Sequence, residues 1–295
     1  MIGWVMPKSP PGLIGWFFNQ NTPSQRCIFS IKRKKVTTVT VWIKSLRLPI
    51  CFLAGLLAIA GFKIADIPIS WLSVAAVFFG MCATMLQNDW RDRYHDVRKG
   101  KTLALKRPRA FLALLLAFWA VACGLAITVG IENINTGTVL FFMILAGLVY
   151  SEVRRIPMAP VTLVVFTSGS PVLLPIAAGA GANKVWLLFL STALIIFGRE
   201  ITKDIDDHQI DGGYKWTIPL AVGSKWAKVI AVVAIASGLA VAVKVSAAVL
   251  PAIILAVIGV ILLLRGARPM TARIFLDAGL ALALLAVIIF GFKIH

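Results

Sequence analysis

The chain has 295 residues, 59% of them hydrophobic and 14% charged, and its mean hydropathy is +0.90. A soluble domain of this length could not remove so much apolar surface from water, so the composition excludes a soluble globular protein and predicts a chain that crosses a membrane several times. The formal net charge of +18 would suit a nucleic-acid-binding protein, but the sequence contains no basic module with interleaved aromatic residues, so we expect no nucleic-acid partner.

Apolar segments follow one another along the chain, and each is predicted to be a transmembrane helix, because unpaired backbone groups cost too much in lipid. They lie near residues 48–62, 69–87, 110–131, 137–150, 159–180, 185–198, 228–243, 246–264 and 272–293. Several are shorter than the roughly 20 residues that a perpendicular span needs, so we expect their helices to continue beyond the apolar core. The predicted fold class is therefore an all-α membrane protein, a bundle of about nine transmembrane helices.

The basic residues are distributed unevenly across the predicted membrane. If the spans alternate in direction, all of the 30 lysines and arginines fall on the side of the N-terminus except Lys63, Lys184, Lys244 and Lys293. By the positive-inside rule this side is cytoplasmic, and the C-terminus lies on the opposite side. We expect residues 1–45 to form a basic cytoplasmic arm that fixes topology or attracts anionic membrane lipids, and residues 46–295 to form the transmembrane domain.

Most of the chain's 12 acidic residues lie in two short stretches, each placed where an apolar segment meets a basic loop. The first stretch follows the second predicted span and the second follows the sixth, so the predicted topology puts both on the cytoplasmic side. Both contain aspartates at the same offsets of three and four residues. If the helices continue through these stretches, residues four apart share a face and form two carboxylate stripes.

Oxygen ligands in this pattern indicate a divalent cation. Mg²⁺ takes hard oxygen ligands, keeps several waters and is usually shared between a few carboxylates and substrate phosphates. We therefore expect Mg²⁺ around one diphosphate group. The predicted metal ligands are Asn88, Asp89, Asp92, Asp96, Asp204, Asp207 and Asp211. Of these, Asp89 and Asp204 either bind the metal in the same site or contact the residues that do. The alternative, two solvated helix ends paired with basic neighbours, explains a single stretch better than it explains two matched ones.

The two stretches resemble the signatures of the UbiA-type intramembrane prenyltransferases. The stretch 88–96, with the pattern Asn-Asp-x-x-Asp-x-x-x-Asp, resembles the first signature. The pair of aspartates in 207–211, preceded by Arg-Glu-Ile-Thr-Lys-Asp at 199–204, resembles the second. Two lesser marks agree, namely Tyr-Ser followed by a basic pair at 150–155 and the Thr-x-Pro loop within 213–220. The resemblance covers about residues 40–295.

This resemblance implies Mg²⁺-dependent transfer of a prenyl group from a prenyl diphosphate to a lipophilic acceptor, in a central cavity that opens to the cytoplasmic side. Magnesium would promote the departure of the diphosphate, and a water-free pocket would protect the carbocation-like allylic group. The residues implied to be catalytic are Asn88, Asp92, Asp96, Asp207 and Asp211. The residues expected to bind substrate, mainly as cationic groups for phosphate oxygens, are Arg47, Arg93, Tyr150, Ser151, Arg154, Arg155 and Lys203.

Several alternatives stay open. The acceptor is either an aromatic or quinone precursor or a glycerol-phosphate ether, and the run 199–204 is most similar to the branch that alkylates glycerol-phosphate ethers or related chlorophyll and quinone precursors. A terpene cyclase of the same family would share the metal motifs and use an internal double bond as the nucleophile. A cation-coupled transporter is disfavoured, because its carboxylates usually lie near the bilayer midplane rather than at the ends of spans.

Overall fold

The computed structural model describes residues 42–43, 45–181, 183–212 and 214–290. The chain divides into two units, residues 1–37 and 38–295, and the described residues all belong to the second. The predicted arm, residues 1–45, lies almost entirely outside the described residues, and so does the end of the last predicted span. Within the described part, all regular structure is helical and no strand is present, which confirms the all-α class.

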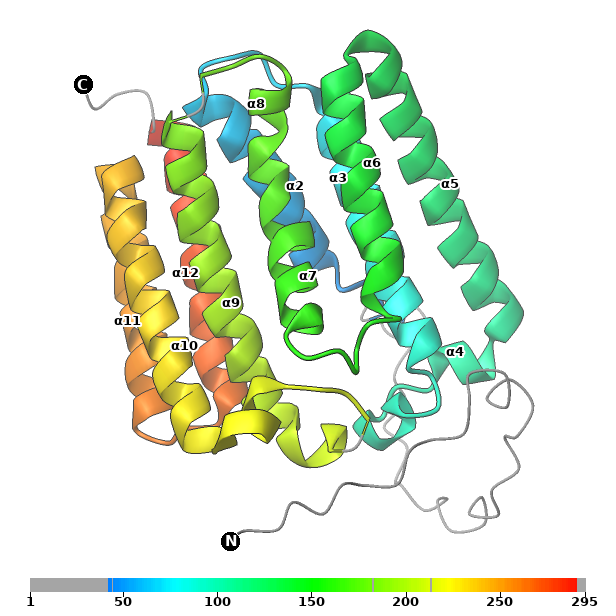
Figure 1. Cartoon of the computed structure of the whole chain (residues 1–295), viewed down its shortest axis with the longest axis vertical. Helices are drawn as coiled ribbons and strands as arrows, with labels where there is room; N and C mark the ends of the chain where they lie inside the picture. The colour runs from blue at the N-terminus through cyan, green and yellow to red at the C-terminus, as the bar shows by residue number, and fades with distance from the viewer. Residues whose placement is uncertain (1–41, 44, 182, 213, 291–295) are drawn as a thin grey trace, which may run out of the picture. The chain divides into compact units, whose positions relative to one another are not determined.

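The long helices lie side by side in Figure 1 and alternate in direction along the chain. They are α2 (Leu48–Ile64), α3 (Trp71–Arg91), α5 (Pro108–Glu132), α6 (Ile134–Tyr150), α7 (Ala159–Gly169), α9 (Asn183–Asp211), α10 (Ile218–Val245), α11 (Leu250–Leu264) and α12 (Pro269–Phe290). Short helices join them, namely η1 (Asp96–Lys99), α4 (Leu103–Lys106), η2 (Ser170–Leu173), α8 (Leu174–Ala177) and η3 (Ala247–Val249).

Seven helical segments of the described chain are long and apolar enough to cross a membrane. They are α3, α5, the run from α7 to α8, most of α9, α10, the run from η3 to α11, and α12. The remaining long helices, α2 and α6, are apolar but have only 17 residues each. Every one of these helices overlaps a segment predicted from the sequence. The chain is therefore a multi-pass membrane protein, while the crossing of the membrane by α2 and α6 stays a prediction.

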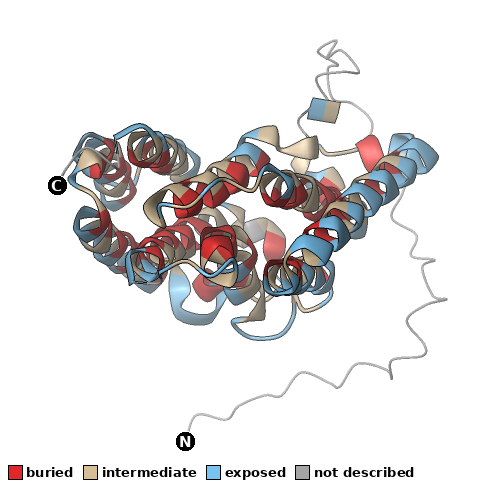
Figure 2. Ribbon diagram, turned by 90° about the horizontal axis from the view of Figure 1, so that it is seen from above, coloured by how far each residue is buried: buried red, intermediate tan, exposed pale blue. Residues whose placement is uncertain are grey.

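Six of the helices form a closed ring. Helix α2 packs against α3 and α12, α3 also packs against α6, and α7 connects α6 to α9, which in turn packs against α12. Outside this ring, α5 lies against α3 and α6, α10 lies against α9, and α11 lies against α12 (Figure 1). Figure 2 shows buried residues on the faces that helices turn toward one another and exposed residues on the outward faces. The exposed apolar faces are those that a membrane would cover.

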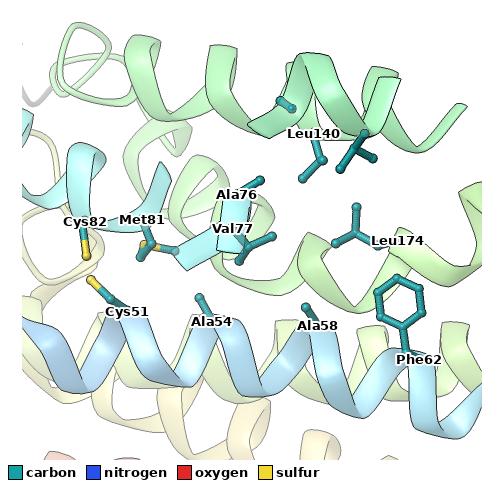
Figure 3. Close-up of a cluster of buried hydrophobic side chains, with 12 residues drawn as sticks. Cys51, Ala54, Ala58, Phe62, Ala76, Val77, Met81, Cys82, Leu140 and Leu174 are labelled. Carbon is teal, nitrogen blue, oxygen red and sulfur yellow. The ribbon is translucent and has the colours of Figure 1, made fainter. Parts of the chain in front are cut away.

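Small side chains let the ring helices α2 and α3 approach each other closely. Figure 3 shows Ala54 and Ala58 of α2 in one buried cluster with Ala76 and Val77 of α3. Close approach of this kind stabilises helix pairs in lipid, where burial of apolar surface gains little and van der Waals packing decides.

Helices α9 and α10 are held together at two glycines. A Cβ atom on Gly238 of α10 would lie 2.9 Å from the carbonyl oxygen of Ser191 on α9, and one on Gly198 of α9 would lie 2.7 Å from the carbonyl oxygen of Ala231 on α10. The Ser191 hydroxyl also donates a hydrogen bond to the carbonyl of Gly238, at 2.9 Å. This contact fixes α9, the helix that carries the second acidic stretch.

Candidate functional site

The two acidic stretches lie at the same end of the ring, the lower end in Figure 1, but they differ in local structure. Helix α9 continues through Asp211, as expected. Helix α3 ends at Arg91, so the first stretch is not one regular helix, and Asp96 begins the separate helix η1. The spacing of four is nevertheless kept, because the N–H of Asp92 donates to the carbonyl of Asn88 at 2.9 Å and the N–H of Asp96 donates to that of Asp92 at 2.8 Å.

A cavity of about 340 Å³ lies inside the ring, which is within the usual range for small-molecule sites. Its charged end is lined by residues of both acidic stretches, Asn88, Asp92, Asp96, Asp204, Asp207 and Asp211. Its other end is lined by apolar residues of α2, α3 and α12, among them Leu53, Leu57, Met81 and Leu280. One cavity therefore combines clustered carboxylates with an apolar interior.

The residues predicted to bind substrate are only partly at this cavity. Those that line it are Arg47, Tyr150, Ser151, Arg154 and Lys203. Arg93 and Arg155 are not among its lining residues. Arg93 donates to the carbonyl of Trp90 at 2.8 Å and lies over the Trp90 ring, whereas Arg155 is exposed. A role for these two arginines in substrate binding stays a prediction.

Asp89 differs from the other predicted ligands, because it does not line the cavity. It accepts from Arg47 at 2.8 Å and from Lys101 at 2.9 Å, and Lys101 also donates to Asp96 at 2.8 Å. Arg47 has a left-handed backbone with φ of 49°, a conformation that costs a non-glycine residue about 1 kcal/mol or more. The ion pair with Asp89 offsets this cost and holds the guanidinium of Arg47 at the cavity.

Asp92 is held by residues from two loops. The Tyr214 hydroxyl donates to Asp92 at 2.7 Å, and Arg154 forms an ion pair with Asp92 and contacts Tyr214 as well. Arg154 also donates to the carbonyl of Ser151 at 2.7 Å, while its own carbonyl accepts from the N–H of Trp216 at 2.9 Å. These contacts fasten the loop after α9 and the loop after α6 to the first acidic stretch.

Asp207 and Asp211 are paired with lysines. Lys99 lies 2.7 Å from Asp207 and 3.2 Å from Asp211, and Lys215 lies 2.8 Å from the second oxygen of Asp211. Burial alone would raise the pKa of Asp211, but the ammonium groups of Lys215 and Lys99 outweigh burial and hold that pKa below its ordinary value. Burial would lower the pKa of Lys215, and the neighbouring carboxylates of Asp204 and Asp211 raise it instead. Asp211 and Lys215 therefore carry their charges at neutral pH.

A second charged cluster lies deeper in the cavity, on α9 and α12. Arg199 donates to Asp277 at 2.6 Å and also pairs with Glu200, which accepts from Lys203 at 2.6 Å. Arg273 lies 4.0 Å from Asp277, so Arg199 is the closer partner. Because Arg199, Lys203 and Arg273 all line the cavity, its wall presents cations beyond the acidic stretches.

Sequence reasoning missed several lining residues. His95 was not among the predicted site residues, yet it lines the cavity and stacks on Tyr214 with 3.9 Å between ring centroids. Lys99 and Lys101 follow the first acidic stretch at short spacing, a pattern that could have marked them as its counter-ions. Tyr214 carries no such signal, because its place depends on the path of the loop after α9.

The donor atoms at the charged end suit Mg²⁺. Among the described residues, no three Asp, Glu, His or Cys side chains lie close enough together to hold a metal ion by themselves, since lysines and arginines lie between them. The oxygens from the two stretches nevertheless face one cavity, and Mg²⁺ needs only one or two carboxylates when phosphates and waters complete its shell. The residues present therefore fit this metal in the company of a phosphorylated ligand.

Comparison with known proteins identifies the family. The UbiA prenyltransferase family matches the chain over residues 48–292. The chain belongs to the UbiA prenyltransferase family. No curated protein matches it in sequence.

Solved UbiA structures share this fold. The apo structure of a UbiA homologue from Aeropyrum pernix K1 has a TM-score of 0.69 and 16% identity, covering 82% of this chain and 98% of that one. A digeranylgeranylglyceryl phosphate synthase has a TM-score of 0.59 and 23% identity, covering 87% and 99%. A UbiA homologue from Archaeoglobus fulgidus bound to DMAPP and Mg²⁺ has a TM-score of 0.50 and 16% identity, covering 86% and 88%.

Proposed function

We propose that this UbiA-family protein transfers a prenyl group from a prenyl diphosphate to a lipophilic acceptor within the membrane, with Mg²⁺ as cofactor. One observation carries the proposal: carboxylates from the end of α3, from η1 and from α9 line one end of a cavity whose other end is apolar. Membership of a prenyltransferase family supports the reaction, and a structural relative that binds DMAPP and Mg²⁺ supports the donor and the metal.

The residues that would hold Mg²⁺ are those of the two stretches that line the cavity, Asn88, Asp92, Asp96, Asp204, Asp207 and Asp211. When bound, Mg²⁺ neutralises the diphosphate and stabilises its departure. Asp89 has a different role in this proposal, because it does not line the cavity and its contacts hold Arg47 and Lys101.

The chain's own cations bind the remaining phosphate oxygens. Lys99, Lys101 and Arg154 line the charged end and are now paired with the carboxylates there. Charge-assisted hydrogen bonds from ammonium and guanidinium groups to phosphate are short and strong, and a bidentate guanidinium also fixes orientation. We assign these groups to holding the diphosphate, with Arg47, Tyr150, Ser151 and Lys203 as further contacts.

The apolar end of the cavity receives the isoprenoid tail. Its lining residues on α2, α3 and α7 include Leu53, Met81 and Val164. These side chains exclude water, so the carbocation-like allylic group persists until the acceptor attacks it.

The acceptor proposed here has an anionic head group. Arg199, Lys203 and Arg273 line the cavity beyond the acidic stretches, and together they exceed in charge the two carboxylates that pair with them, Glu200 and Asp277. This surplus favours a glycerol-phosphate ether over an uncharged aromatic acceptor. The likeness to a digeranylgeranylglyceryl phosphate synthase supports the same choice.

The cavity opens to the cytoplasm in this proposal. Exposed Lys106 lies at the end of the bundle that carries the charged end of the cavity, and the exposed Lys184 and Lys244 lie at the other ends of their helices. In a variant without native cysteines, a cysteine at position 106 should react with an impermeant maleimide only from the cytoplasmic side. A cysteine at position 244 should react only from the opposite side, and the reverse pattern would overturn the assignment.

The test of the reaction uses protein in nanodiscs with geranyl, farnesyl and geranylgeranyl diphosphate. Mg²⁺-dependent diphosphate release and the mass of the product are followed for Asp92→Asn, Asp207→Asn and Glu152→Gln. Each aspartate variant should slow release by about 10²-fold or more, as loss of a group that stabilises transition-state charge does. Glu152, an exposed residue that pairs with Arg91, is the matched acid-to-amide control and should leave release unchanged.

Three outcomes separate the alternatives. A prenylated acceptor among the reaction products extracted from the nanodiscs supports the transferase and identifies its donor. A cyclised hydrocarbon or alcohol as the sole product supports a terpene cyclase instead. The absence of both Mg²⁺-dependent release and Mg²⁺-dependent donor binding would overturn the proposed function and favour a cation-coupled transporter.

A further inference from the structure

A small apolar cavity of about 30 Å³ lies beyond the apolar end of the main one, between α9, α10, α11 and α12. It is lined mostly by alanine, valine, leucine and isoleucine side chains, with Ser191 and Thr192 as its polar members. The Ser191 hydroxyl is satisfied by the carbonyl of Gly238. This second cavity is therefore suited to a hydrocarbon group.

Leu280 of α12 separates the two cavities. Among the described residues, it alone lines both. Its side chain is only 6% exposed and belongs to a buried cluster with Leu57 of α2 and Leu188 of α9. Leu57 lines the main cavity and Leu188 lines the second one. The side chain of Leu280 therefore lies between Leu57 on the side of the main cavity and Leu188 on the side of the second.

The walls of the main cavity end at this point. Its lining residues at α2 extend from Arg47, just before the helix, to Leu57, and those on α12 extend from Met270 to Leu280. At a rise of 1.5 Å per residue, each wall is about 15 Å long from its charged end to the buried cluster. A tail that enters from the charged end with its diphosphate held there meets Leu57 and Leu280 last.

We propose that Leu280 sets the longest prenyl chain that the protein accepts, by closing the floor of the cavity in front of the second one. The inference rests on the proposed function, because it concerns the tail of the same donor. A tail that ends short of Leu280 is bound without rearrangement. One that is an isoprene unit too long collides with a buried leucine in a close-packed cluster, which cannot move without displacing its neighbours.

A competing route for the tail exists on the other side of the ring. A third cavity of about 30 Å³, between α3, α6 and α7, borders the main one at Met81, Thr84 and Thr167. The hydroxyls of Thr84 and Thr167 donate to backbone carbonyls of their own helices, at 2.9 and 2.8 Å, so both are fixed in place. Three side chains separate these two cavities, whereas one separates the main cavity from the cavity beside α12.

The test compares Leu280→Ala with Leu284→Ala. Leu284 lies one helical turn further along α12 and is also buried, but of the two cavities it lines only the second. Wild type and variants in nanodiscs are assayed for diphosphate release with geranyl, farnesyl, geranylgeranyl and geranylfarnesyl diphosphate, and kcat/KM is obtained for each donor. In Leu280→Ala, the donor one unit longer than the wild-type limit should gain about tenfold relative to the preferred donor, the size of effect that hydrophobic pocket changes have on specificity. In Leu284→Ala this ratio should stay at the wild-type value.

Two further variants check the result, and the first of them does not depend on the folding of Leu280→Ala. Leu280→Phe places a larger side chain at the end of the main cavity, which shortens the cavity and should move the preference to a shorter donor. Ala283→Leu fills the second cavity, which Ala283 lines, so in the Leu280→Ala background it should restore the wild-type preference. The unfolding temperature of each variant is measured alongside.

The outcomes are distinguishable from those for the proposed function. Wild-type release with unchanged chain-length preference in both Leu280→Ala and Leu280→Phe overturns the inference and leaves the proposed function standing. A shift in Met81→Ala without one in the Leu280 variants also overturns it and places the tail on the side of α3 and α6. No release from any donor by the wild type overturns the proposed function, and this inference with it.

Discussion

Lys99 of η1 and Asp207 of α9 form an ion pair across the charged end of the cavity, with 2.7 Å between Nζ and Oδ2. The same ammonium lies 3.2 Å from Asp211. One lysine just after the first acidic stretch thus pairs with two carboxylates of the second, Asp207 and Asp211. In the proposed function these carboxylates are ligands of Mg²⁺, so the ammonium group of Lys99 and the metal compete for the same oxygens.

Replacement of Lys99 by an uncharged residue should therefore strengthen the binding of Mg²⁺ to Asp207 and Asp211. We expect Lys99→Met to tighten Mg²⁺ binding by about tenfold, which corresponds to about 1.4 kcal/mol, and to lower the unfolding temperature when Mg²⁺ is chelated. Isothermal titration with Mg²⁺ alone measures the first effect, and thermal unfolding in EDTA measures the second. The control is Lys106→Met, which removes an exposed lysine of α4 in the same loop region. Equal or weaker Mg²⁺ binding in Lys99→Met would contradict the competition.

The ion pairs of Asp211 predict acid sensitivity. The pKa of Asp211 is lower in the folded chain than the value of about 3.9 for an unfolded aspartate, so its carboxylate stabilises the fold above that value. The contribution is fully present at neutral pH and is lost as pH falls below about 4 through the folded pKa. The unfolding temperature of the wild type should therefore drop in this range. In Asp211→Asn it should be lower at pH 7 and vary less below pH 4, and an identical acid profile for the two proteins would refute the assignment.

Much of the fold was predictable because a long apolar run in a membrane protein must form a helix to satisfy its backbone hydrogen bonds. The segment predicted near 48–62 is α2 at Leu48–Ile64, and the one near 110–131 is α5 at Pro108–Glu132. The largest difference between an apolar run and its helix concerns α9, where the helix was expected to continue into the second acidic stretch. The apolar run predicted a span near 185–198, whereas the helix continues to Asp211. Its charged last turns line the cavity rather than lipid, so hydropathy alone underestimates the helix.

The candidate site was predictable in outline but not in detail. The spacing of the aspartates placed both stretches at one cavity, as the lining residues show. It set Asp89 apart from Asp92 but left open whether Asp89 joins the site, and in the structure Asp89 does not line the cavity and contacts Arg47 and Lys101 instead. Tyr214 reaches Asp92 through a loop contact over a long sequence separation, for which a single sequence has no periodic signal.

In the charged cluster of α9 and α12, loss of Arg199 should destabilise the fold more than loss of the charge on Asp277. Arg199 is buried and pairs with both Glu200 and Asp277, so Arg199→Leu leaves the buried Glu200 with Lys203 alone. We expect a cost of about 3 kcal/mol, as when a buried pair loses one partner. Asp277→Asn should cost about 1 kcal/mol or less, because the side chain of Asp277 is 36% exposed and solvent screens it. Thermal unfolding in detergent measures both, and a larger loss in Asp277→Asn than in Arg199→Leu would contradict this ranking.

The close contact of α9 and α10 at Gly238 predicts a further loss of stability. A Cβ atom there would lie 2.8 Å from Cγ1 of Ile195 and 2.9 Å from the carbonyl oxygen of Ser191, and a backbone carbonyl cannot move aside as a flexible side chain can. Gly238→Ala should therefore force the helices apart, cost about 1–3 kcal/mol and weaken the hydrogen bond from the Ser191 hydroxyl. Gly124→Ala is the matched control, because nothing lies within 4 Å of a Cβ atom at that position on α5. Alanine is the better helix former, so this control should be as stable as the wild type or more stable. If Gly238→Ala unfolds at the same temperature as Gly124→Ala, the α9–α10 contact does not depend on the glycine, and the position of the second acidic stretch must be fixed by the other partners of α9.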